Sequence, residues 1–229
     1  MKPIVLMIAL SVAILGQTAP EGVPGIGQKM KENAEALKQY SYKRRTEVQF
    51  KDKSRVSVEK VRYVNGQPET TPLETPAPSA AAGGGRGLRG MMARKKIEEK
   101  KEEMKEEVDR LKSLLQSYTP HGSDSMRQIL EKATISRTGQ GPNADVRVAA
   151  TGVVQPSDSF TLVWSAANHR PERIEIRAEL DNKPVQLAVD YSALPNGVFY
   201  PARTTISLPA KDLTVTVESF DYMPSVPSN

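Results

Sequence analysis

The stretch "ERIEIRAELDNKPVQLAVDYS", residues 172–192, alternates apolar and polar side chains on both sides of an Asp-Asn-Lys break. In each half, apolar residues occupy every second position and mostly charged or polar residues stand between them. Successive side chains of a strand point to opposite faces of a sheet, so the pattern predicts two antiparallel strands with one apolar and one wet face. The break supplies the turn that joins them.

The chain on both sides of this hairpin repeats the alternation. Further strands are expected at residues 40–50, 54–64, 144–154, 159–167, 197–208 and 213–223. Asn196 and Gly197 predict a tight turn, and Pro201, which lacks a backbone N–H, suits an edge or a bulge. These strands predict a mainly β protein of the α+β class, in which a curved antiparallel sheet must wrap its apolar side around something.

Helices are expected in three places. Residues 28–38 and 123–133 predict short helices, and residues 91–118 predict one long charged helix with a narrow apolar stripe. That stripe either packs against the sheet or forms a coiled-coil seam. Residues 66–90 are rich in Pro, Thr, Ala and Gly, which predicts a disordered segment.

The N-terminal residues carry the pattern of an export signal. Lys2 precedes an apolar run over residues 4–15, and small and polar residues follow, so residues 1–19 predict a signal peptide and a periplasmic protein. The alternative is an uncleaved segment that retains the protein at the membrane. Residues 20–27 then form a linker, residues 28–222 a single β domain with an insertion at residues 66–143, and residues 223–229 a tail. The chain has no cysteine, so neither a disulfide nor a lipidated thiol is expected.

The residues that catalysis needs are not grouped in this sequence. The two histidines, His121 and His169, lie in separate breaker segments without a second histidine at ligand spacing. No Gly-x-Ser-x-Gly elbow occurs, and the glycine-rich stretches do not follow strands as a phosphate loop requires. The sequence therefore predicts a protein that is not an enzyme and that has neither a metal nor another cofactor.

A basic arm precedes the long helix. Its cations are interleaved with apolar residues and no acid stands among them: Arg86, Arg89, Arg94, Lys95 and Lys96. Such a segment suits an anionic membrane surface or a protein partner. The alternative is a flexible arm that leads into a helix in water. Nucleic acid is not expected, because the arm lacks aromatic side chains for stacking.

The segment "DYSALPNGVFYPARTTISLPAKDLTVTVESFDY", residues 190–222, together with the export signal, resembles the periplasmic lipoprotein-sorting carriers, the LolA/LolB-like family. The resemblance covers residues 28–64 and 145–222. It implies a half-open antiparallel β-barrel with covering helices around an apolar cavity that carries acyl chains. The insertion at residues 66–143 departs from the family, and the absence of cysteine excludes its lipid-anchored branch.

On this interpretation the protein takes part in lipoprotein transport, holding a lipid acyl chain or a lipidated protein without covalent chemistry. The expected cavity-lining residues are Val148, Leu162, Trp164, Ile174, Ile176, Leu187, Val189, Ile206, Leu213, Val215 and Val217. The alternative is a non-enzymatic envelope scaffold with a filled β domain, which docks a partner through the long helix and the basic arm. Alternation cannot distinguish a hollow interior from a filled one.

Overall fold

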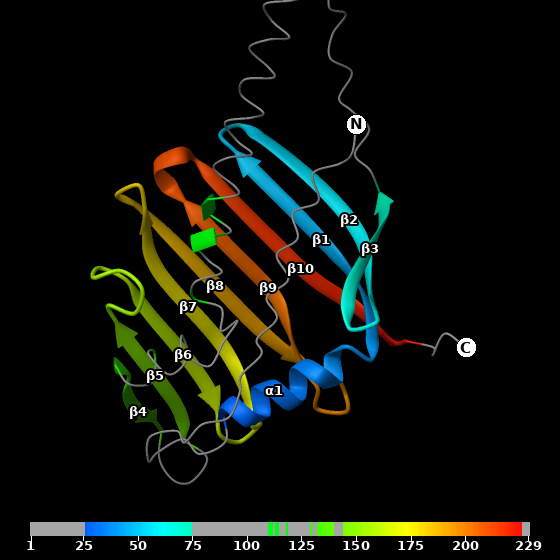
Figure 1. Ribbon diagram of the computed structural model, residues 1–229, viewed down its shortest axis with the longest axis horizontal. Coiled ribbons are helices and arrows are strands. Elements are labelled where there is room, and N and C mark those ends of the chain that lie inside the picture. The colour runs from blue at the N-terminus through cyan, green and yellow to red at the C-terminus, as the bar shows by residue number, and fades with distance from the viewer. Residues whose placement is uncertain are drawn as a thin grey trace, which may run out of the picture.

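A computed structural model of the chain describes residues 26–74, 110–111, 113–114, 118, 129, 132–139 and 144–225 (Figure 1). The elements with complete bounds are α1 (Ile26–Leu37), β1 (Tyr40–Phe50), β2 (Lys53–Val64), β3 (Gln67–Glu74), β4 (Thr134–Thr138), β5 (Asp145–Thr151), β6 (Ser159–Ser165), β7 (Arg170–Leu180), β8 (Lys183–Ala193), β9 (Phe199–Leu208), the 3-10 helix η1 (Pro209–Lys211) and β10 (Leu213–Pro224).

The ten strands form a single sheet in the order β3-β2-β1-β10-β9-β8-β7-β6-β5-β4, and each neighbouring pair is antiparallel. From β4 to β10 the chain runs as a meander, as the alternation predicted. The first hairpin then adds to the last strand, because β1 pairs with β10. The first and last strands of the domain therefore meet inside the sheet rather than at its edges.

The expected curved antiparallel sheet is confirmed, whereas the number of covering helices differs from the expectation among the described residues. The sheet is not closed into a barrel, since β3 and β4 remain its two edges (Figure 1). Closure would require β3 to donate hydrogen bonds, and Pro68 and Pro72 lack the N–H groups to do so. Among the described residues, α1 is the one α-helix with complete bounds.

Little of the two expected insertion helices falls within the described residues. Within the expected long helix at residues 91–118, positions 110, 111, 113, 114 and 118 are helical. Within the expected short helix at residues 123–133, positions 129 and 132 are helical. The other residues of both segments lie outside the described part, so the charged stripe and the coiled-coil alternative stay predictions.

Two strands were not expected. Residues 67–74 fall in the segment predicted to be disordered, yet they form β3, which pairs with β2 along its length. Its side chains are mostly Gln, Glu and Thr and do not alternate with apolar residues, so the sequence pattern did not predict this strand. The usable signal was the turn: Asn65 and Gly66 have φ values of 52° and 75°, as a type I′ hairpin requires. The other strand, β4, lies within the expected insertion at residues 66–143 and forms the short opposite edge of the sheet.

The predicted turn and bulge near the end of the chain are confirmed. Gly197 has a φ of 83° and donates its N–H to the carbonyl of Leu194 at 2.9 Å. Between Asp190 and Tyr191 the register of β8 with β9 shifts, and Tyr191 then lies opposite Pro201. Proline has no N–H to donate to the neighbouring strand, and a bulge interrupts the hydrogen bonds between strands at that point, so the proline is tolerated there.

Candidate ligand-binding face

The strand register places the expected cavity-lining residues in rows across one face of the sheet. One row follows neighbouring partners from β5 to β10 through Val148, Leu162, Ile174, Val189, Thr204 and Val217. The next row follows Ala150, Phe160, Ile176, Leu187, Ile206 and Val215. Partners that face each other across antiparallel strands share a face, so these rows form one continuous apolar surface, here called the wall.

The wall is covered by other parts of the same chain. All eleven expected lining residues are buried, and none is more than 8% exposed. Leu111, Tyr118 and Ile129 belong to the same buried cluster, and Leu114 packs against it. These four are called the cover residues. An amphiphile that reaches the wall must therefore replace contacts that the chain itself makes.

A buried hydrogen bond joins the cover to the sheet. The hydroxyl of Tyr118 donates to Oδ2 of Asp158 at 2.6 Å. Asp158 stands just before β6 and also accepts the backbone N–H groups of Val153, Val154 and Gln155, each at 2.7 Å. Asp158 thus stabilises the loop between β5 and β6 and holds the cover with the same carboxylate.

The two partners shift each other's proton affinity. Burial alone would raise the pKa of Asp158, but the hydrogen bonds from Tyr118 and from three backbone amides outweigh it and hold that pKa below its ordinary value. Burial, together with the hydrogen bond to the carboxylate, raises the pKa of Tyr118 above its ordinary value. The pair therefore remains a neutral phenol and a charged carboxylate at neutral pH.

Helix α1 lies along one end of the sheet and contacts β7 and β9 (Figure 1). The side chain of Asn33 forms two hydrogen bonds with the backbone of Phe199, accepting its N–H at 2.7 Å and donating to its carbonyl at 2.6 Å. Nearby, Asn196 donates to the hydroxyl of Tyr40 at 2.7 Å. The corner at residues 194–198 thus lies against α1 and the start of β1.

Aromatic side chains end the wall on the side of α1. The rings of Trp164 and Phe199 meet edge to face with centroids 6.3 Å apart, and Phe199 meets Tyr191 in the same way at 6.2 Å. Trp164 and Phe199 are buried, so the single tryptophan is a core and wall residue, as the sequence predicted. Edge-to-face pairs stabilise a core beyond the area they bury.

The same face changes character at β1 and β2. Tyr42, Arg44 and Thr46 alternate along β1, and Thr46 lies opposite Val217 of the wall. Arg44 and Glu59 are buried partners across β1 and β2, where Nε donates to Oε1 at 2.8 Å. Nη2 of Arg44 lies 2.6 Å from the same oxygen but makes no hydrogen bond of acceptable geometry. Removing either partner would leave the other charge buried and unpaired, which would strongly destabilise the folded protein.

Four tyrosines gather beside this ion pair and are here called the tyrosine patch: Tyr42, Tyr63, Tyr200 and Tyr222. The rings of Tyr42 and Tyr222 stack at 4.7 Å, and those of Tyr200 and Tyr222 lie 4.2 Å apart. Burial, reinforced by Tyr63, raises the pKa of Tyr42 to about 12. All four side chains are half-buried, so part of each ring reaches the surface.

The opposite face of the sheet is wet, and its charges compensate one another. Arg45 pairs with Glu47 at 2.7 Å and with Glu218 at 3.2 Å. Arg173 pairs with Glu175 at 2.7 Å and with Asp190 across β8. Exposed pairs of this kind contribute little to stability. The positive charges of Arg45 and Arg173 are therefore compensated by carboxylates on this face.

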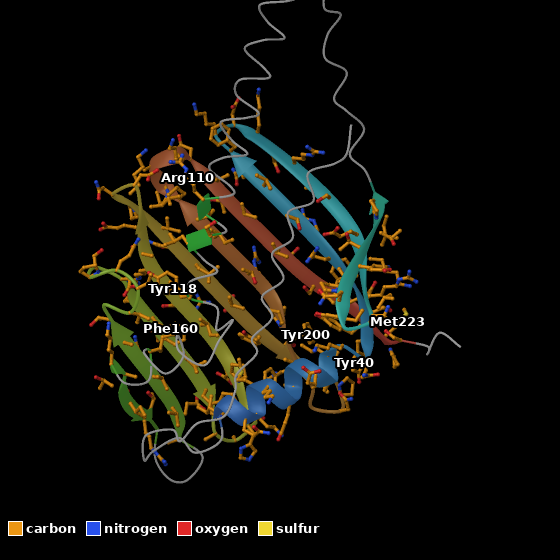
Figure 2. The ribbon with its side chains drawn as sticks, in the orientation of Figure 1. Tyr40, Arg110, Tyr118, Phe160, Tyr200 and Met223 are labelled. Atoms are coloured by element: carbon orange, nitrogen blue, oxygen red, sulfur yellow. The ribbon has the colours of Figure 1, made fainter. Side chains whose placement is uncertain are left out.

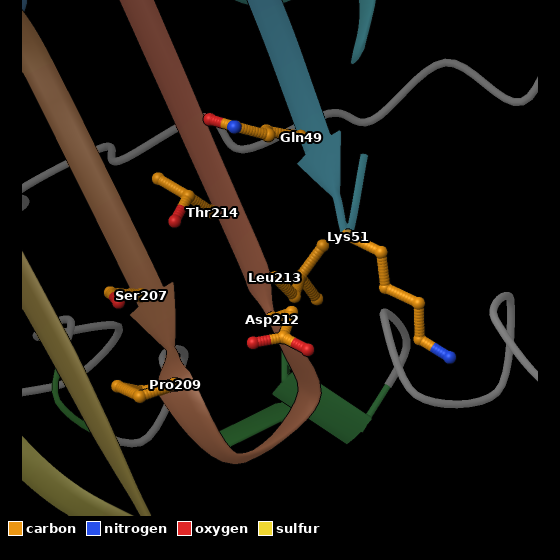
Figure 3. A pocket seen from close by; sticks show the side chains of 7 residues that line it. All are labelled: Gln49, Lys51, Ser207, Pro209, Asp212, Leu213 and Thr214. Atoms are coloured by element: carbon orange, nitrogen blue, oxygen red, sulfur yellow. The ribbon is translucent and has the colours of Figure 1, made fainter. Parts of the chain in front are cut away.

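A cavity of about 320 Å³ opens at the far end of β1 and β10 (Figure 3). Its lining comes from β1, the β1–β2 turn, β9, η1 and β10: Gln49, Lys51, Ser207, Pro209, Asp212, Leu213 and Thr214. Lys51 and Asp212 each have a left-handed backbone, and the N–H of Lys51 donates to the carbonyl of Asp212 at 2.8 Å. This lining is mostly polar, so the cavity does not match an acyl chain.

Part of the expected site lies outside the described residues. This holds for the basic arm with Arg86, Arg89, Arg94, Lys95 and Lys96. Sequence reasoning missed Asn33 and Asp158, since both act on partners that are distant in the chain. Within the described ranges, no group of three or more His, Cys, Asp or Glu residues is placed to hold a metal ion. None of the helices in those ranges is both long and apolar enough to span a membrane.

Comparison with known proteins gives structural neighbours only. No family model matches the chain, and no curated protein matches it. One neighbour is described as an outer membrane lipoprotein-sorting protein domain from Vibrio parahaemolyticus; the identity is 8%, the TM-score 0.41, and the match covers 86% of this chain and 90% of that one. A LolA superfamily protein from Nitrosomonas europaea has 9% identity and a TM-score of 0.37, covering 82% of this chain and 87% of that one.

A DUF1329 family protein from Desulfovibrio piger has 6% identity and a TM-score of 0.40, with coverage of 90% and 93% of the two chains. Two of the three descriptions name lipoprotein-sorting or LolA proteins. Since all three TM-scores lie below 0.5, the function of this chain has to be inferred from its own residues.

Proposed function

We propose that the chain is an exported carrier or binding protein that holds an acyl chain, free or attached to a protein, against the wall without covalent chemistry. The observation that supports this most is the combination of a wall spanning β5 to β10 with cover residues fastened through Tyr118 and Asp158. The export pattern of residues 1–19 supports the localisation outside the cytoplasm.

Hydrocarbon can replace the cover residues because apolar contacts are not directional. Burying a fourteen-carbon chain yields on the order of 10 kcal/mol, at about 0.8 kcal/mol per methylene. The wall is already covered in the free protein, so affinity is the difference between contacts to the ligand and contacts to the cover. The proposal therefore makes binding a competition for one apolar surface.

The first test is native mass spectrometry of the protein purified from its own envelope. We expect a mass increment that corresponds to a lipid and a rise in melting temperature when a fatty acid is added. A bare chain mass, with no thermal response to any lipid, would count against the carrier.

A variant of the cover tests the competition directly. Leu111→Ala removes a buried cover side chain, so the free protein should lose about 2–5 kcal/mol of stability. Added fatty acid should restore more of the melting temperature in this variant than in the wild type, because the ligand no longer has to displace Leu111. Leu73→Ala is the control, since Leu73 is 47% exposed on β3. If the interior is a filled core, Leu111→Ala will lose stability and lipid will not restore it.

A further inference from the structure

The tyrosine patch draws four of the seven tyrosines in the chain from four different strands to one corner of the sheet. Tyr42 lies on β1, Tyr63 on β2, Tyr200 on β9 and Tyr222 on β10. Tyr40 and Tyr200 both appear beside the end of α1, while Tyr118 and Phe160 lie on the other half of the sheet (Figure 2). The fold therefore brings rings from distant sequence positions into one surface. Half-buried tyrosines present both apolar ring faces and hydroxyl groups.

The patch continues the wall. Along β1, the face that carries Val48 opposite Val215 carries Thr46, then Arg44, then Tyr42. Val61 of β2 lies opposite Tyr42 and is fully buried, so the patch has an apolar base. A molecule that extends along the wall toward β1 would therefore leave hydrocarbon and reach polar groups at this corner.

The polar groups of the patch are mainly donors. Besides burial, Tyr42 and Tyr63 shift each other's pKa, so their two hydroxyl groups lie close together. Arg44 adds Nη2, which has no hydrogen bond of acceptable geometry although its side chain is only 5% exposed. Glu59 compensates the charge of Arg44, so the donors surround a site without net charge.

We infer that the tyrosine patch binds the uncharged linkage of an acylated ligand, an ester or amide carbonyl, while the acyl chain lies along the wall. This inference rests on the proposed carrier function and adds the chemistry by which the ligand is recognised. Carbonyl oxygens accept hydrogen bonds from phenol and guanidinium donors. A free carboxylate gains less, because Glu59 already neutralises Arg44.

The test uses two probes that differ only in the carbonyl. These are 1-lauroylglycerol, an ester, and 1-O-dodecylglycerol, its ether analogue with the same head and chain length. Each probe displaces a fluorescent fatty acid from the full-length protein. We expect the wild type to bind the ester about five- to tenfold more tightly than the ether, as one or two hydrogen bonds allow.

The double variant Tyr42→Phe, Tyr63→Phe removes both hydroxyls and keeps the rings and the Arg44–Glu59 pair. We expect its preference for the ester over the ether to fall at least twofold, because two of the patch hydroxyls are gone, with its affinity for the ether unchanged. Tyr40→Phe is the matched control, because it removes a tyrosine hydroxyl that belongs to neither the patch nor the wall, and it should keep the ester preference. If the double variant does not fold, Tyr63→Phe alone serves the same comparison.

The outcomes separate this inference from the carrier function. Equal binding of ester and ether by the wild type would overturn the patch inference and leave the carrier standing. A preference that survives in the tyrosine variants would also overturn it. If neither probe displaces the fatty acid, or the fatty acid does not bind, the carrier function fails and the patch inference fails with it.

Discussion

Asp158 holds together two pieces of chain that are distant in sequence, the β5–β6 loop and the cover. Its carboxylate accepts three backbone N–H groups of the β5–β6 loop and the hydroxyl of Tyr118 in the cover. Four hydrogen bonds to one buried carboxylate offset the unfavourable burial of its charge. Asp158 therefore makes the buried polar attachment of the cover, in addition to the packing of Leu111 and Ile129 and the exposed ion pair of Arg110 with Asp181.

Tyr118→Phe tests this attachment. Leaving the buried carboxylate without its phenol donor should lower the free energy of unfolding by about 1–3 kcal/mol at pH 7, measured by urea denaturation. Tyr191→Phe, which removes the hydroxyl of another tyrosine, should change it by less than about 1 kcal/mol. Equal losses in the two variants would contradict a special role for Tyr118.

The loss should also depend on pH in a defined direction. The pKa of Asp158 is lowered in the folded protein, so its stabilisation is complete above its unfolded pKa of about 3.9 and falls as pH drops through the folded pKa. The pKa of Tyr118 is raised, so its contribution is complete below the unfolded pKa of about 10 and falls above it. Urea titrations should show the largest difference between wild type and Tyr118→Phe between these limits. A difference that grows at acidic pH would refute the assignment.

His169 offers a separate test of backbone strain. It ends the β6–β7 turn with a φ of 50°, a left-handed conformation that disfavours side chains. His169→Gly should raise the melting temperature, because glycine adopts a positive φ without the steric cost of a side chain. Ala167→Gly in the same turn should lower it, because Ala167 has no positive φ to relieve. A loss of stability in both variants would show that His169 makes a contact that outweighs its strain.

For single residues, the sequence predicts which apolar side chains are neighbours on the sheet. It does not predict which polar side chains form hydrogen bonds with each other. The wall residues follow from alternation, because position along a strand decides the face. The bond between Tyr118 and Asp158 joins residues 40 positions apart, and that between Asn33 and Phe199 joins residues 166 apart. No local pattern encodes such separations.

At the scale of elements, α1 depends on one side chain for its attachment to the sheet. Asn33 is buried on α1 and pairs with both backbone groups of Phe199 at the start of β9. The side-chain amide of Asn33 thus gives Phe199 the two hydrogen bonds that the backbone of a neighbouring strand would otherwise make. It also ties the helix to the corner that Asn196 and Gly197 form.

Asn33→Ala should therefore destabilise the protein by about 2–4 kcal/mol, since it leaves a buried N–H and a buried carbonyl without partners. Gln28→Ala is the control on the same helix. Gln28 is exposed and donates to Glu32, so its loss should amount to a few tenths of a kcal/mol. Similar urea midpoints for the two variants would show that α1 is held by apolar packing instead.

The eight alternating strands were predictable because the alternation of apolar and polar residues within each strand indicates which of its faces is buried. β3 and β4 were not, because an edge strand exposes polar side chains and needs no apolar face. The Asn65–Gly66 turn was the missed signal for β3, and the prolines within β3 weakened the pattern further.

At the scale of the whole molecule, alternation predicted a meander of antiparallel strands. It could not predict which strand pairs with the last one or which strands form the edges of the sheet. The pairing of β1 with β10 and the open edges at β3 and β4 are properties of the complete sheet. The half-open barrel came from the family resemblance, and the prolines of β3 fit a sheet that does not close, because they deprive this edge of donors. Whether the wall takes a ligand is likewise a competition between cover and hydrocarbon, which no single segment encodes.

The junction of β1 with β10 has a consequence for biogenesis. Arg45 and Glu218, which form an ion pair across this junction, stand 173 positions apart in the chain. The first hairpin therefore has no neighbour to dock on until the last strand has been synthesised, and contacts of such long range form slowly. Under the proposed export, this delay would help the chain to remain unfolded while it crosses a membrane, because the β1–β10 junction cannot form before its final residues arrive.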